Sequence, residues 1–302
     1  MAMFQVKRFR GLSDQQFALV LVMPAVILCF VVIVIPILYN VYLSFTAYQI
    51  VDPERGFAFV GLKNYARVLR RTDFLSSFGK AMIFSVGATL LEFILGFAAA
   101  LLLNSQIRLR ELFRGILVIP WVMPTVVVAY LWLWVLNGQF GILNWLLVQI
   151  GVLSEFFNWL SDPISAFAGV IFINSWKTFP FHMVILLAAL QTIPEELLEA
   201  ANIDGASAIQ RFWRITLPLM RYVILALLMF RFILNLRNFD IIFMTTEGGP
   251  GIATLTMPLW IYRVGFLEWD TSMAAAIAVL WAIVMAIVAG LVMRFGRLAG
   301  ED

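Results

Sequence analysis

Six long apolar segments dominate this sequence and restrict the folds open to it. They cover residues 17–45, 80–103, 116–136, 164–190, 219–244 and 272–293. About 20 apolar residues are needed to cross a hydrocarbon core about 30 Å thick, so each segment is long enough to span a bilayer. Lipid offers the backbone no hydrogen-bond partners, and no segment alternates as a barrel strand does. The sequence therefore predicts an all-α membrane protein with six transmembrane helices.

The composition supports one membrane domain. Of the 302 residues, 63% are hydrophobic and 13% are charged, whereas about half of a soluble protein is apolar. We expect a cytoplasmic N-terminal segment over residues 1–16 and a transmembrane domain over 17–302. The first apolar segment exceeds the bilayer thickness, so it is tilted or projects, and Pro24 and Pro36 are candidate kinks. Its length and the lack of a cleavage site favour an uncleaved anchor over a signal peptide.

The distribution of basic residues predicts the orientation. With the N-terminus inside, eleven Lys and Arg lie near cytoplasmic ends and six near outer ends, although the first outer loop opposes the trend. The inner set is Lys7, Arg8, Arg10, Arg108, Arg110, Arg114, Arg211, Arg214, Arg221, Arg294 and Arg297, and the outer set is Arg55, Lys63, Arg67, Arg70, Arg71 and Arg263. A multi-pass protein with a cytoplasmic N-terminus is therefore expected.

A polar break over residues 192–217 separates the fourth and fifth apolar segments. Thr192 and Glu195 have capping-box spacing, which predicts a helix start there. Gly205 suits a left-handed helix stop because it has no Cβ. A second short helix follows and should end at Pro218. The pattern indicates a helix–turn–helix loop at the membrane surface, suited to a partner's groove, although an ordinary amphipathic connector is the alternative.

The residues of this break resemble a known motif. Glu199, Ala200 and Ala201 are followed by three residues and Gly205, with Leu-Pro twelve residues further on. This spacing is similar to the EAA loop of ATP-binding cassette (ABC) importer permeases. Four more stretches narrow the resemblance to the carbohydrate-uptake, maltose-type subfamily: GLKNY from Gly61, LAALQTIP from Leu187, TEGGP from Thr246, and IYR from Ile261 before Gly265 and Phe266.

The resemblance implies a type I ABC importer permease fold with cytoplasmic coupling helices. It implies one of two homologous permease subunits in a bacterial inner membrane, with two ATPase subunits that hold ATP and Mg and an extracytoplasmic solute-binding protein. The cargo would be a sugar, polyol or glycoside. Contact with the ATPase would fall on Glu199, Ala200, Ala201, Asp204 and Gly205, and contact with the binding protein on Gly248, Gly249 and Pro250, although that turn also has a purely structural explanation.

Polar residues inside the apolar segments need an explanation, because a charge at the bilayer centre costs about 2.5–3.5 kcal/mol. Arg231, Asn235 and Asn238 share one helical face by their spacing. They line a sugar path, or they join helices, for example by pairing Glu92 with Arg231 or Lys177. The expected path residues are Asn174, Trp176, Lys177, Arg231, Asn235 and Asn238. Arg231, Arg237 and Lys177 outnumber the nearby acidic residues, so an anionic sugar derivative is conceivable.

Several kinds of chemistry are missing from the sequence. Cys29 and His182 are the single residues of their types, so neither an internal disulfide nor a typical metal site is expected. No phosphate-binding Gly-rich motif occurs, so any ATP that powers transport must be hydrolysed by another subunit. We expect a transport subunit and not an enzyme. Its surroundings should be membrane lipid, and no nucleic-acid partner is expected. Two alternatives remain: an ion-coupled secondary transporter, for which Glu92 is the well-placed carboxylate, and a membrane-embedded enzyme.

Overall fold

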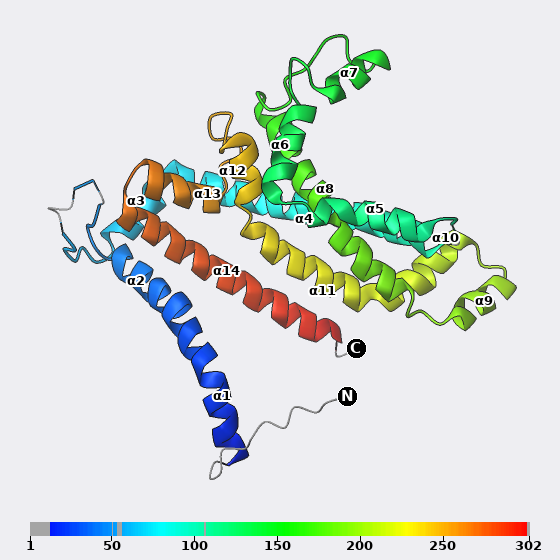
Figure 1. Cartoon of the computed structure of the whole chain (residues 1–302), viewed down its shortest axis with the longest axis horizontal. Helices are drawn as coiled ribbons and strands as arrows, with labels where there is room; N and C mark the ends of the chain where they lie inside the picture. Colours follow the sequence, from blue (N-terminus) through cyan, green and yellow to red (C-terminus); the bar gives the residue numbers. More distant parts are fainter. Residues whose placement is uncertain (1–12, 50, 53–55, 106, 301–302) are drawn as a thin grey trace, which may run out of the picture. The chain divides into compact units, whose positions relative to one another are not determined.

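The computed structural model describes residues 13–49, 51–52, 56–105 and 107–300, and this part of the chain is helical, with no strand beyond isolated bridges (Figure 1). The all-α prediction is confirmed. In chain order the elements are α1 Asp14–Cys29, a π-helix Phe30–Val34, α2 Ile35–Ser44, α3 Lys63–Arg70, α4 Thr72–Asn104, α5 Arg110–Val122, α6 Thr125–Val135, α7 Ile142–Gln149, α8 Pro163–Leu190, α9 Glu195–Ile203, α10 Ala208–Arg211, a π-helix Phe212–Thr216, α11 Leu217–Leu236, α12 Asp240–Thr246, α13 Met257–Tyr262, a π-helix Arg263–Leu267 and α14 Thr271–Gly300.

Five of the six predicted spans are single helices, and the third is broken. The single spans are Gln15–Ser44, Thr72–Asn104, Pro163–Leu190, Ala208–Leu236 and Thr271–Arg294. The third span consists of α5 and α6, which meet at an angle of 98°. Met123 is extended at the break, because the ring of Pro124 disfavours a helical residue before it. One continuous helix over 116–136 is therefore a wrong prediction, whereas six crossings hold if α5 and α6 form one.

Pro218 does not end a helix, contrary to our prediction. The helix runs from Ala208 to Leu236, with a π-helix at Phe212–Thr216 directly before Leu217 and Pro218. The first span repeats this arrangement, because Phe30–Val34 precedes Pro36. A π turn widens the helix where proline lacks its N–H group and crowds the carbonyl four residues earlier, so the chain continues. The fifth span also ends at Leu236, before 244.

The chain divides into two compact units, residues 1–68 with 264–279, and 69–263 with 280–302. In the first unit, Asn64 of the GLKNY stretch donates to the backbone oxygens of Ser44 (2.9 Å) and Thr46 (2.7 Å), which closes the end of α2. Arg67 pairs with Asp270 at 3.0 Å. The predicted boundary between 1–16 and 17–302 stays a prediction, and Lys7, Arg8 and Arg10 lie outside the described residues.

The second unit is built on α4 and α8, which pack along each other with α11 beside them (Figure 1). Small residues allow the close approach. A Cβ on Gly96 would lie 2.4 Å from the Cβ of His182 and 2.9 Å from the oxygen of Phe179. Apolar side chains fill the end of this interface nearest α9: Phe97, Leu103, Met183, Leu186, Leu190, Met220 and Leu227. These three helices position the polar residues described next.

Candidate functional site

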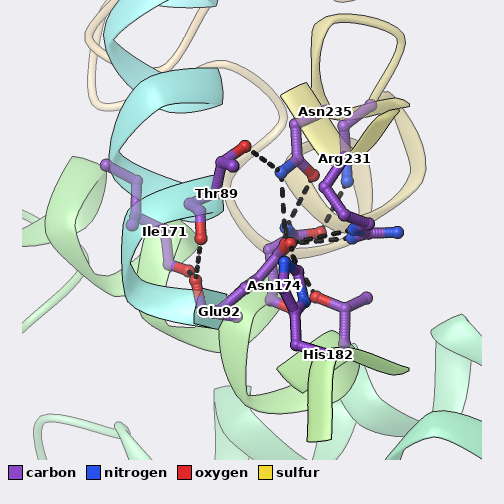
Figure 2. Close-up of polar contacts among 11 residues, drawn as sticks. Thr89, Glu92, Ile171, Asn174, His182, Arg231 and Asn235 are labelled. Carbon is purple, nitrogen blue, oxygen red and sulfur yellow. Dashed lines mark hydrogen bonds and ion pairs between the residues drawn. The ribbon is translucent and has the colours of Figure 1, made fainter. Parts of the chain in front are cut away.

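Glu92 on α4 is fully buried and is the centre of a polar cluster (Figure 2). Arg231 donates to it through Nε (2.9 Å to Oε2) and Nη2 (3.0 Å to Oε1), which is the fork geometry of a strong ion pair. Oε1 also accepts from Asn174 (2.9 Å), Thr178 (2.8 Å) and Asn235 (3.2 Å). The cluster therefore ties together α4, α8 and α11.

Arg231 and Asn235 are occupied by this cluster. Their side chains face α4, and only 9% and 3% of their surfaces are exposed. Asn235 also donates to Thr89 at 3.0 Å and accepts from Asn174 at 3.2 Å. Pairing satisfies a charge that lipid would otherwise penalise. Of the two interpretations of the stripe, helix joining is the one that these contacts fit at Arg231 and Asn235.

His182 lies beside the cluster without joining its hydrogen bonds. It is fully buried, its Nδ1 is 3.8 Å from Oε2 of Glu92, and neither ring nitrogen has a hydrogen-bond partner. Its Cβ faces Gly96 of α4, where an added Cβ would lie 2.4 Å from it. His182 therefore occupies a core position. Among the described residues, no group of three His, Cys, Asp or Glu could hold a metal ion.

A polar hollow of about 180 Å³ lies beside the cluster, where α6 begins, α8 passes and α11 gives way to α12. Asn238 joins it to the cluster by donating to Asn174 at 2.6 Å. We call this space the polar hollow; it is lined by Thr125, Asn174, Lys177, Thr178, Arg237, Asn238, Phe239, Asp240 and Ile241. Every lining residue belongs to the second unit.

The structure thus divides the expected path residues. Asn174, Lys177 and Asn238 line the polar hollow, whereas Arg231 and Asn235 lie behind it. Trp176 packs edge-to-face on Trp132 instead, with ring centroids 5.5 Å apart.

Thr125 is one of the lining residues that the sequence analysis missed. It comes to the hollow only because the chain breaks at Pro124, and that proline was the available signal. Arg237, which the sequence analysis counted among the basic residues that favour an anionic cargo, and Asp240, to which it gave no role, also line the hollow.

The polar break forms two short helices, α9 and α10, joined by a tight turn. Gly205 has φ +77°, and its N–H donates to the oxygen of Asn202 at 3.1 Å, while Ala206 donates to that of Ala201 at 2.9 Å. These two bonds make a Schellman stop, which confirms the left-handed glycine. We call α9, this turn and α10 the coupling loop.

The capping box is displaced from its predicted place. Thr192 donates its hydroxyl to the oxygen of Ala189 at 2.8 Å and does not cap α9, because Pro194 occupies the N-cap position. The box forms at α10 instead, between Ser207 and Gln210.

The coupling loop exposes apolar side chains. No residue of α9 is buried, and the exposed fractions of Ile203 and Ile209 are 86% and 72%. Glu199, Ala200, Asp204 and Gly205 are exposed, and Ala201 is half-buried. Isoleucines this exposed next to acidic residues are typical of a surface that a partner covers.

The Gly248–Pro250 turn is held by its own hydrogen bonds. Gly249 donates to the oxygen of Thr246 at 2.7 Å, and Thr254 returns a backbone bond to Gly248 at 3.0 Å. Gly248 is buried against Leu255, whereas Gly249 and Pro250 are half-buried. A contact with a second protein could therefore use Gly249 and Pro250 more readily than Gly248.

Comparison with known proteins agrees with this architecture. The family "Binding-protein-dependent transport system inner membrane component" matches residues 92–297. Trehalose/maltose transport system permease protein MalF of Thermococcus litoralis is 39% identical over 277 residues, 92% of each chain. Sulfoquinovosyl glycerol transport system permease protein SmoG of Agrobacterium fabrum is 34% identical over 93% of this chain and 91% of its own.

A solved structure shows the same fold. A chain of a bacterial ABC transporter involved in the import of the acidic polysaccharide alginate superposes with a TM-score of 0.79. It covers 93% of this chain and 95% of that chain at 23% identity, so the likeness concerns the fold. The predicted type I importer permease fold is confirmed. With the family match and these relatives, the chain belongs to the binding-protein-dependent transport system inner membrane components.

Proposed function

We propose that this chain forms half of the translocation path of an ATP-driven, binding-protein-dependent importer for a sugar, polyol or glycoside. Its relatives include permeases named for trehalose, maltose and sulfoquinovosyl glycerol. They support a carbohydrate cargo and leave its charge open. The observation that carries the proposal is the exposed coupling loop, because a rigid two-helix loop with bare isoleucines needs a partner to cover it.

The family match supports a set of partners that this proposal includes. A second homologous permease completes the path, two ATPase subunits bind ATP and Mg, and an extracytoplasmic binding protein delivers the cargo. Glu199, Ala200, Ala201, Asp204 and Gly205 contact an ATPase subunit, and the turn at Gly248, Gly249 and Pro250 faces the binding protein. The coupling loop and the N-terminus lie in the cytoplasm of a bacterium whose inner membrane holds the complex.

The coupling loop is covalently continuous with the helices that line the polar hollow. It follows α8, which carries Asn174 and Lys177, and it leads into α11, which ends just before Arg237 and Asn238. Closure of the ATPase dimer displaces the loop and with it both helices. ATP drives transport because it binds one state of the complex more tightly than the other.

The contacts of Glu92 argue against the alternative of an ion-coupled transporter. Such a transporter needs a membrane carboxylate that can release a proton or bind an ion. Glu92 already accepts five hydrogen bonds, two of them from Arg231. Uptake that collapses with the proton gradient while ATP is intact would restore this alternative.

The test uses the single cysteine of the chain. Cys29→Ser removes it, and Ile203→Cys then adds a thiol on the coupling loop, where the native side chain is 86% exposed. In sealed vesicles, a membrane-impermeant maleimide should label this thiol only from the cytoplasmic face, and bound ATPase subunits should protect it. The matched control is Ile150→Cys in the connector after α7, where the native side chain is 70% exposed.

The control thiol should be labelled only from the outer face, with or without ATPase subunits. Labelling of the coupling loop from the outer face would refute the proposal. Labelling that ATPase subunits leave unchanged would refute the docking role of the loop.

A further inference from the structure

Two basic side chains line the polar hollow, and neither is held in an ion pair by a described residue, although Asp240 lines the same space. Lys177 is half-buried on α8 and Arg237 is exposed after α11. In the part of the chain that the structure describes, neither forms an ion pair or a hydrogen bond. By the rise of an α-helix, Lys177 lies about 20 Å along α8 from its first residue, which is far from either end. An unpaired lysine at such a depth is costly and therefore indicates a function.

The charges around the hollow sum to a positive value. Lys177 and Arg237 contribute two positive charges, and Asp240 contributes one negative charge. Behind the hollow, Glu92 and Arg231 neutralise each other through their fork of hydrogen bonds. A concave surface with excess positive charge attracts an anion.

A second observation concerns an acceptor that lacks a donor. The side-chain oxygen of Asn238 is buried and has no hydrogen-bond partner, while its amide group donates to Asn174. Buried acceptors of this kind are uncommon, and a hydroxyl donor from a ligand would satisfy this one once the Asn238 side chain rotates towards the hollow. Phe239 adds an apolar ring surface to the lining. The hollow therefore offers positive charge, a free acceptor and a ring face together.

The size of the hollow limits what it can hold. Its volume of about 180 Å³ is below the roughly 300 Å³ at which pockets for whole small molecules begin. It can thus receive one residue of a larger ligand. An acidic sugar residue has the matching groups: a carboxylate or sulfonate for the cations, a hydroxyl for Asn238, and a ring for Phe239.

We propose that the polar hollow is a subsite for the acidic residue of a glycoside, with Lys177 and Arg237 binding its carboxylate or sulfonate and Asn238 accepting from its hydroxyl. This inference rests on the proposed import of carbohydrate and adds the charge of the cargo. It assigns to Arg237 and Asp240 opposite effects on selectivity, because they carry opposite charges at the same opening.

The experiment compares D-glucuronate with D-glucose, which differ by one carboxylate, on the complete importer in lipid nanodiscs. The readout is the acylation of the Lys177 amine by a small anhydride, measured by mass spectrometry. Each sugar is titrated to find the concentration that protects half of the Lys177 amines. Lys63, an exposed lysine of the other unit, reports the activity of the reagent.

Glucuronate should protect Lys177 at about one fifth of the glucose concentration, the ratio that a partly exposed ion pair supplies. Arg237→Gln should bring this ratio towards one, and Asp240→Asn should raise it. The matched control is Arg221→Gln at the opposite end of α11, which should leave the ratio unchanged. Asn238→Leu should weaken protection by both sugars, because both bring hydroxyls.

Any of the following results would overturn the inference: equal protection by the two sugars in the native importer, a ratio that Arg237→Gln leaves intact, and protection by inorganic sulfate at the concentration that suffices for glucuronate. The last would mean an adventitious ion only. A native Lys177 that resists acylation without any sugar would mean that a carboxylate of the second permease pairs with it, which also overturns the inference. Cytoplasmic labelling of Ile203→Cys is independent of these results and keeps the proposed function separate.

Discussion

Replacing Glu92 by glutamine removes the negative charge from the cluster and keeps its shape. Glutamine retains one oxygen that can accept from Asn174, Thr178 or Asn235, so little neutral hydrogen bonding is lost. Neutral hydrogen bonds between membrane helices average about 0.6 kcal/mol in double-mutant cycles. The large effect comes from Arg231, whose guanidinium stays buried without a counter-charge.

Two estimates give the magnitude for Glu92→Gln. Breaking a buried ion pair by removing one partner costs about 3–5 kcal/mol. An uncompensated arginine at the centre of a membrane helix costs about 2.5–3.5 kcal/mol on insertion scales. The ranges overlap near 3 kcal/mol, which is several times the value of a neutral hydrogen bond. We therefore expect the free energy of unfolding to fall by about 3 kcal/mol.

The assay is equilibrium unfolding of the purified chain in mixed micelles, run as a double-mutant cycle with Arg231→Gln. The double variant should be more stable than either single variant, because no charge remains buried. Thr89→Val, which removes one hydrogen bond from Asn235, serves as the matched control and should lose about 0.6 kcal/mol. Additive losses in the cycle, or a Glu92→Gln loss no larger than that of Thr89→Val, would refute the reasoning.

Three further changes are predicted. Gly205 has φ +77°, so Gly205→Val should cost at least the roughly 1–2 kcal/mol of a left-handed non-glycine residue and should weaken ATPase-subunit pull-down and uptake. Gly205→Asn should retain most of both, and equal pull-down by the two variants would argue against this. Gly96→Ala should lower the unfolding free energy by about 1–3 kcal/mol, because the new Cβ meets His182 and Phe179. Gly79→Ala on the same helix has open space and should not lower it, so equal melting temperatures of the two variants would contradict the prediction. Asn235→Leu leaves its partners in the cluster unmatched and should cost about 1–3 kcal/mol in thermal unfolding, whereas a loss of uptake at native stability would return Asn235 to the path.

Local rules predicted what depends on neighbouring residues. Segment length was enough for the spans, since the bilayer sets it, and the missing Cβ was enough for Gly205. The prolines were harder to predict, because three of them lead to two different outcomes. Pro124 accompanies a 98° bend, whereas Pro36 and Pro218 follow π-helices within continuous spans. The outcome depends on how the helix around each proline packs, which the local sequence does not contain.

The sequence predicted several of the polar residues that form the site, but it did not predict which of them contact one another. Helical spacing correctly places Arg231 and Asn235 on one face, but α11 ends at Leu236, so Asn238 lies beyond the helix. The partner of that face, Glu92, lies 139 residues from Arg231 in the sequence. The side chains of Arg231 and Asn235 face α4, and Asn238 lines the hollow from the segment between α11 and α12. Periodicity cannot distinguish a face that packs on a helix from one that meets water, because both need polar groups.

The same contacts limit where the polar hollow can change shape. Its α8 side is tied to α4 and α11 by the Glu92 cluster, so these three helices resist separation there. The remaining lining lies at two interruptions of the helices, Met123–Pro124 before α6 and residues 237–239 between α11 and α12. Backbone that lacks regular helical hydrogen bonds rotates at lower cost than an intact span, and hinges are usually residues at the ends of elements. When the coupling loop is displaced, the motion passes along α8 and α11. The part of the hollow that moves most easily is therefore the lining at Thr125 and at Arg237–Asp240.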